Sequence, residues 1–69
     1  MPLSLAPLGA EQIVRRVGGS GEARSHLEDL GFVPGAPVAV VSTMGGDLIV
    51  RVKDARIAIS QELANKIIV

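Results

Sequence analysis

The stretch covering residues 26–38 constrains the fold of this chain more than any other, because it encodes a helix end, a turn and the start of a strand. Leu27 and Leu30 share one face of a predicted helix. Gly31 follows directly, and a glycine adopts the left-handed conformation of a helix C-terminus without the usual Cβ penalty. Phe32, the only aromatic residue, is then placed to contact Leu27 in a Schellman motif. We therefore expect Gly31 to have a positive φ.

The residues around this helix end predict several short strands. Pro34-Gly35 is a turn dipeptide, and Gly45-Gly46 suits the positive φ angles of a hairpin turn. Between such turns, apolar residues alternate with polar ones, as in half-buried strands. We predict strands at residues 11–17, 37–43, 48–53, 56–59 and 67–69. The apolar pattern of the first is irregular, which is compatible with a bulge.

Two helical segments and a lead-in complete the predicted elements. The longer helix begins after Ser20, a favourable N-cap residue, and runs to about Leu30. A short helical turn at residues 61–65 follows Ser60, which can cap it in the same way. Residues 1–10 are predicted to be extended, with leucines that close one end of the core, namely Leu3, Leu5 and Leu8.

The pattern as a whole predicts a mainly β protein. Short strands joined by tight turns, with one inserted α-helix and a short C-terminal helical turn, are typical of a small closed barrel of about five strands. The 69 residues suffice for a single domain spanning residues 1–69. The chain has no cysteine, so neither a disulfide nor a thiolate metal site can stabilise it.

Composition and charge also argue against several classes of function. The formal net charge is zero, whereas a dedicated nucleic-acid binder usually carries a basic surplus. No apolar run reaches the length of a membrane span, so we expect a cytosolic protein that does not insert into the membrane. His26 is the only histidine, and its neighbour Ser25 would not face it on a helix. No nucleophile, base and orienting group can be assembled, and we predict that the protein is not an enzyme.

One helix stripe carries metal-ligating side-chain types. Glu22, His26 and Asp29 are spaced at i, i+4 and i+7, and an imidazole with two carboxylates can hold a divalent transition metal ion such as iron or zinc. Three such ligands without a thiolate make a weak, open site. We therefore favour a solvated helix face over a metal site.

A partner surface is predicted on the strands, because several of them carry apolar residues on both faces while a small barrel has only one interior. Ile49 lies opposite the predicted core residues of its strand and shares its face with Arg51 and Lys53. Val41 and Ile68 are candidate members of the same patch. A contiguous apolar patch of this kind usually marks a contact site. Its occupant would be a protein partner or, alternatively, a second copy of the chain.

The chain resembles the FeoA family over almost its whole length. The central residues that carry the resemblance are Leu27-Glu28-x-Leu30-Gly31-Phe32-x-Pro34-Gly35, followed by a valine-rich strand and Gly45-Gly46. Further matching residues lie on either side, at Leu5-x-x-Leu8-Gly9, Arg56-Ile57-Ala58-Ile59 and Glu62-Leu63-Ala64-x-x-Ile67-x-Val69.

This resemblance implies an SH3-like barrel and a role as a small cytosolic accessory protein of bacterial ferrous iron uptake. It also implies a partner, the FeoB-type membrane transporter with its cytoplasmic GTPase domain, which would bring the protein to the inner membrane. Transition metal binding is inferred for the family by analogy with the SH3-like domain of iron-dependent repressors. Two alternatives remain, a metal-linked regulatory domain related to those repressors and a nucleic-acid-binding barrel. The first would lack the DNA-binding helices, and zero net charge argues against the second.

Overall fold

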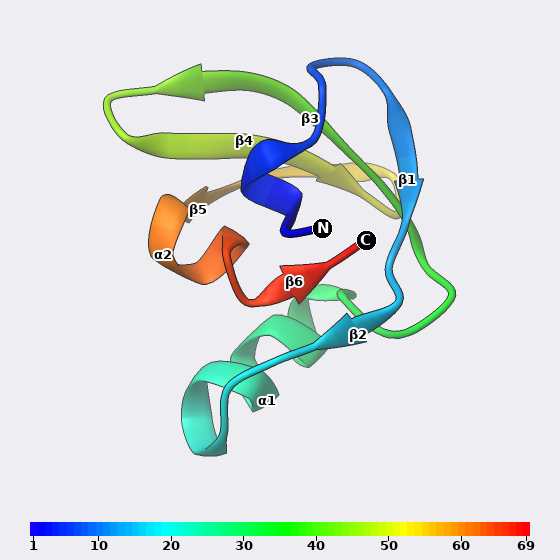
Figure 1. The fold of residues 1–69 in the computed structure, drawn as a ribbon, viewed down its shortest axis with the longest axis vertical. Coiled ribbons are helices and arrows are strands. Elements are labelled where there is room, and N and C mark those ends of the chain that lie inside the picture. Colours follow the sequence, from blue (N-terminus) through cyan, green and yellow to red (C-terminus); the bar gives the residue numbers. More distant parts are fainter.

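The computed structural model describes residues 1–69 and is mainly β, as predicted (Figure 1). Its elements in chain order are the 3-10 helix η1 (Leu3–Leu5), β1 (Glu11–Ile13), β2 (Arg16–Val17), α1 (Gly21–Leu30), β3 (Pro37–Met44), β4 (Asp47–Val52), β5 (Ala55–Ser60), α2 (Gln61–Ala64) and β6 (Ile67–Ile68). The positions of the two α-helices and of the later strands agree with the sequence prediction to within one or two residues.

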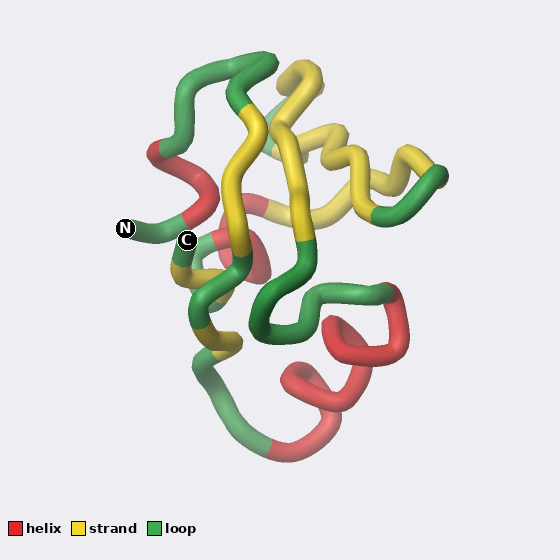
Figure 2. The backbone as a smooth tube through the Cα atoms, turned by 90° about the vertical axis from the view of Figure 1, so that its right-hand side faces the viewer, coloured by secondary structure: helices red, strands yellow, loops and turns green.

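The strands form two antiparallel sheets. One has four strands in the order β1-β3-β4-β5, and the other consists of β2 and β6. Figure 2 shows α1 below the four-stranded sheet, connected to the strands by loops at both ends. The prediction of a closed barrel is therefore wrong in one respect, because β1 and β5 are open edges of the larger sheet.

The predicted first strand, residues 11–17, is divided between the two sheets. β1 pairs with β3, whereas β2 pairs with β6. The change occurs between neighbouring residues, since the Val14 N–H donates to the Ala36 carbonyl at 2.9 Å and the Arg15 N–H donates to the Ile68 carbonyl at 2.7 Å. The irregular apolar pattern of this segment thus reflects a change of partner that bends the chain from one sheet to the other.

A single cluster of buried apolar side chains fills the space between the sheets and the helices. Its largest fully buried members are Phe32, Leu3, Leu27, Ile67, Val14, Val38, Val40, Val50 and Val52. The lead-in supplies only one of its three leucines to this core. Leu5 and Leu8 are 69% and 62% exposed, so the prediction that they close the core is wrong. The η1 turn buries Leu3 and directs the next leucines outward.

The end of α1 confirms the predicted Schellman motif. Gly31 has a φ of 112°, and its N–H donates to the Glu28 carbonyl at 3.0 Å. The Phe32 N–H donates to the Leu27 carbonyl at 3.0 Å, and both side chains are fully buried. At the other end of the helix, Ser20 has the extended conformation of an N-cap but makes no side-chain hydrogen bond.

The C-terminal segment returns to the beginning of the chain. The Ser60 hydroxyl accepts a hydrogen bond from the Leu63 N–H at 3.1 Å, which confirms the predicted cap of α2. After β6, the Val69 N–H donates to the Met1 carbonyl and the Met1 amino group donates to the Val69 carbonyl, both at 2.8 Å. The two ends of the chain consequently lie side by side (Figure 1).

Candidate functional site

The candidate site lies on the face of the four-stranded sheet that points away from the core. Leu48, Val50 and Val52 of β4 point inward and are buried, so Ile49 and Arg51 point outward. The register places the Ala58 side chain beside Ile49 and the Arg56 side chain beside Arg51. We call Ile49, Arg51, Arg56 and Ala58 the outer patch. Ile49 is half-buried, and the other three residues are exposed.

A small residue and an ion pair border the outer patch. Ala39 of β3 lies between Glu11 of β1 and Arg51 of β4. The Arg51 Nη2 atom is 3.9 Å from the Glu11 Oε2 atom, so the two long side chains meet across the Ala39 methyl group. Ala39 is 1% exposed although it does not belong to the core cluster. This arrangement explains how a residue on the outer face is buried.

Arg56 and Ala58 are the members of the outer patch that sequence reasoning missed. The β4–β5 turn has only two residues, with Val52 paired to Ala55. Counting outward from such a turn places residue 51 opposite 56 and residue 49 opposite 58. A two-residue turn at Lys53 and Asp54 would therefore have identified Arg56 and Ala58 from the sequence, had its length been known.

Lys53 was predicted to share the strand face of Ile49, and this is wrong. It follows β4 and occupies the turn with a φ of 56°, which is uncommon for a residue other than glycine. A Cβ placed on Gly31 would come within 3.1 Å of the Lys53 Cε atom, so the lysine stem packs over the end of α1. Lys53 therefore contacts the helix end and not the outer patch.

Val41 and Ile68, the two other predicted members of the patch, do not belong to it in the structure. Val41 is the extra residue of a β-bulge between Val40 and Ser42, and it is half-buried there. Ile68 is also half-buried, but it belongs to β6 and pairs with Arg16 in the two-stranded sheet. The structure thus places Val41 beside the strand pairing that contains Ile49 and places Ile68 in the other sheet.

The metal-ligand candidates Glu22, His26 and Asp29 are all exposed on α1. Nowhere in the structure do three histidine, aspartate or glutamate side chains come together in a group that could hold a metal ion. The only ion pair on α1 joins the Arg24 Nε and Glu28 Oε2 atoms at 3.7 Å and involves none of the three. The residues present do not fit a resident metal centre.

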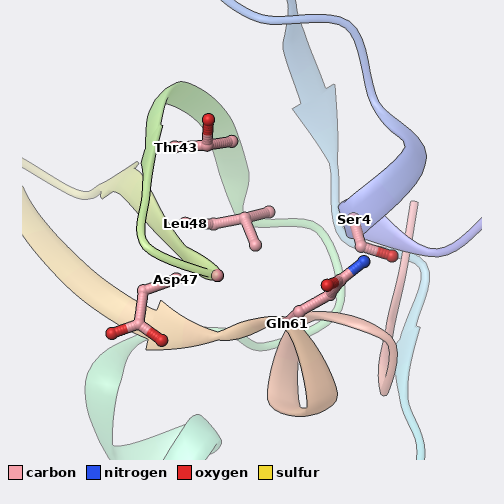
Figure 3. A pocket seen from close by; sticks show the side chains of 6 residues that line it. Ser4, Thr43, Asp47, Leu48 and Gln61 are labelled. Atoms are coloured by element: carbon pink, nitrogen blue, oxygen red, sulfur yellow. The ribbon is translucent and has the colours of Figure 1, made fainter.

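A cavity of about 270 Å³ is lined by none of the outer-patch residues (Figure 3). It is bordered by η1, by the β3–β4 hairpin and by the start of α2, and its lining residues are Ser4, Thr43, Gly46, Asp47, Leu48 and Gln61. Leu48 is the one hydrophobic residue among them. A single carboxylate among hydroxyl and amide groups provides neither a catalytic set nor a metal site. No helix of the structure is both long enough and apolar enough to span a bilayer.

Two small antiparallel sheets packed around one core define the fold class, that of a small SH3-like domain. The FeoA domain model matches residues 1–69, and the chain belongs to the FeoA family. This is an accessory transport family with no known enzymatic activity, and membership associates the chain with ferrous iron transport.

Known relatives agree with this placement. The chain is 34% identical over 68 residues to a Methanocaldococcus jannaschii protein named Fe(2+) transport protein A, a match that covers 99% of this chain and 83% of the relative. The crystal structure of Stenotrophomonas maltophilia FeoA complexed with zinc, described as a procaryotic SH3 domain protein, is 30% identical with a TM-score of 0.88. That match covers 99% of this chain and 87% of the other.

A manganese-dependent transcriptional repressor is similar in structure but not in sequence. It is 16% identical with a TM-score of 0.86, and the match covers 97% of this chain and 39% of the repressor. At this level of identity the similarity concerns the fold alone.

Proposed function

We propose that this protein is a non-catalytic binding module of ferrous iron uptake that docks on the cytoplasmic part of a FeoB-type transporter through its outer patch. It acts in the cytoplasm and reaches the inner membrane through that partner. The ferrous ion is the cargo of the transporter in this scheme and is not held by the Glu22, His26 and Asp29 stripe. Membership of the FeoA family supports a role in ferrous iron uptake. The outer patch supports docking on a protein partner.

The outer patch carries the proposal because it combines apolar and basic groups on one face of the sheet. Ile49 and Ala58 lie side by side at its centre, and Arg51 and Arg56 lie at one end. An apolar centre with a charged border is the common arrangement of a protein contact. Arginine is also enriched among the residues that dominate binding energy.

The test compares matched aspartate substitutions in a binding assay with the purified cytoplasmic part of the transporter. Ile49→Asp is expected to weaken binding at least tenfold, because a charge replaces an apolar anchor worth more than about 1.4 kcal/mol. Ile13→Asp, at the 52% exposed isoleucine of β1, introduces the same charge outside the patch and is expected to change binding less than about twofold. Thermal unfolding followed by circular dichroism tests whether both variants fold.

A second variant covers the case in which Ile49→Asp does not fold. Ala58 is exposed, so Ala58→Glu retains the fold while placing a charge at the centre of the patch. Normal transporter binding by a folded Ala58→Glu protein would contradict the proposal. Self-association that is lost in these variants, without any transporter binding by the wild-type protein, would instead identify a second copy as the occupant.

A further inference from the structure

Strand β5 has one paired edge and one free edge. It is the last strand of the four-stranded sheet, and its neighbour β4 is its only strand partner. No backbone hydrogen bond outside the regular elements involves any residue from Ala55 to Ser60. The N–H and C=O groups of Arg56 and Ala58 that point away from β4 consequently have no protein partner, whereas the Ser60 carbonyl accepts the first hydrogen bond of α2. Such a row of groups is a template for an additional strand.

The free edge of β5 lacks most of the features that usually protect a sheet edge. β1, at the opposite edge of the sheet, has only three residues, whereas β5 has six and contains neither proline nor glycine. Its pairing with β4 is regular from Asp47–Ser60 to Val52–Ala55, without a bulge. Ala55 and Ala58 are small and exposed, so they leave the backbone accessible to an incoming chain.

The charges beside this edge are unbalanced. Arg56 lies directly opposite Arg51, and like charges at such positions are destabilising. Arg51 has a carboxylate partner in Glu11 on its other side, but Arg56 takes part in neither of the two ion pairs of the structure. An incoming carboxylate opposite Arg56 would relieve this repulsion. Asp47, which pairs with Ser60 at the other end of β5, disfavours a second carboxylate there.

The inner side of the same edge is incompletely covered. Ile57 of β5 points toward the core and packs against it, yet it is only half-buried. Its partner Val50 on β4 is fully buried. The difference arises because no strand lies beyond β5 to cover the outer side of Ile57. An apolar side chain on an added strand would fill this position.

We propose that β5 accepts an extended segment of a partner protein as an additional antiparallel strand. The segment would carry a small apolar residue opposite Ala58, an apolar residue covering Ile57 and a carboxylate opposite Arg56. Main-chain hydrogen bonds provide much of the affinity in this mode of recognition, and the alternating side chains provide specificity. The inference rests on the proposed function, since it specifies the chemistry of the segment by which the partner is recognised.

The test uses synthetic peptides of about nine residues, within the usual length of a strand. The probe has the sequence Val-Val-Glu at its centre with serine and threonine on both sides, and its matched control has Val-Val-Lys. Titration into the isotope-labelled protein is followed by backbone amide NMR shifts and by hydrogen exchange. The glutamate peptide is expected to shift the β5 amides and to slow the exchange of those that point away from β4. We expect it to bind about threefold to tenfold more tightly than the lysine peptide.

Charge reversal at two arginines makes the test specific. Arg56→Glu is expected to invert the preference between the two peptides, whereas Arg16→Glu, an exposed arginine of β2, is expected to leave the preference unchanged. The inference is overturned if the shifts fall on β1 or α1, or if Arg56→Glu does not alter the preference. It is equally overturned if β5 is already protected by dimerisation of the free protein.

The peptide assay tests the added strand and the transporter assay tests the proposed partner, so a negative result in one does not decide the other. Absence of peptide binding, with transporter binding still lost in Ile49→Asp, would overturn the added strand and leave the proposed function intact. Peptide binding on β5 by a protein that does not bind the transporter would retain the strand site and overturn the proposed partner.

Discussion

Gly31 is constrained by both its backbone and its neighbours. Its φ of 112° lies in the region that favours glycine, and a Cβ would approach the Lys53 Cε atom to 3.1 Å and the Val52 Cγ2 atom to 3.3 Å. Gly35 has a similar φ of 91°, but a Cβ there would meet nothing within 4 Å. Replacing either glycine therefore strains the backbone, but only a side chain at Gly31 would also be crowded by its neighbours.

We expect Gly31→Ala to lower the free energy of unfolding more than Gly35→Ala does. Both variants carry the cost of a left-handed alanine, about 1 to 2 kcal/mol, and only the first also displaces packed side chains. Urea unfolding followed by circular dichroism measures the difference. Equal losses in the two variants would show that the Lys53 stem yields without cost and that crowding plays no role.

The conformation of Lys53 illustrates what a residue type alone does not reveal. A left-handed φ was predictable at Gly31, Gly45 and Gly46, because glycine in a turn indicates it. Lysine carries no such signal. Its φ of 56° is imposed by the two-residue turn between β4 and β5, while its stem gains contact with the end of α1. Both causes depend on tertiary structure.

At the scale of the elements, the two helices begin in different ways although each begins after a serine. Ser60 accepts a hydrogen bond from the Leu63 N–H, whereas the Ser20 side chain makes no such bond. An N-cap hydroxyl satisfies a helix N–H group that would otherwise lack an intrahelical partner. The sequence pattern is the same in both places, so only the structure distinguishes the functional cap.

We expect Ser60→Ala to destabilise the protein by about 1 kcal/mol, the typical cost of losing an N-cap hydrogen bond. Ser20→Ala is expected to cost less than about 0.5 kcal/mol, because no side-chain hydrogen bond is lost. Chemical denaturation of the two variants beside the wild-type protein checks both values. A larger loss in Ser20→Ala than in Ser60→Ala would reverse the assignment of the caps.

At the scale of the whole molecule, the sequence predicted local events well and long-range pairing poorly. The end of α1, the Gly45-Gly46 turn and the cap of α2 each depend on residues within a few positions of one another. The division of residues 11–17 depends on bonds to Ala36 and Ile68, which are distant in the chain. The same limit applies to the candidate site. Ile49 and Arg51 were identified from alternation along one strand, whereas Arg56 and the separation of Ile68 required the strand pairing.

The pairing of the chain ends also determines how the protein resists mechanical force. Met1 and Val69 exchange two hydrogen bonds, and Pro2 pairs with Ile68 next to them. Tension between the termini therefore breaks the hydrogen bonds of these pairs one after another, starting at the chain ends. Tension along the strands of the larger sheet would instead load many hydrogen bonds together.

We therefore expect a low unfolding force when the protein is stretched by its termini in a single-molecule experiment. The chain has no cysteine, so Pro37→Cys at the start of β3 and Gln61→Cys directly after the end of β5 provide unique attachment points at opposite ends of the larger sheet. Stretching between these points should require a higher force at the same loading rate, because forced unfolding reflects the barrier along the pulled direction. An equal or lower force would contradict this direction-dependent strength. The same protein would thus unfold at a low force when pulled by its termini and at a higher force when pulled across its larger sheet.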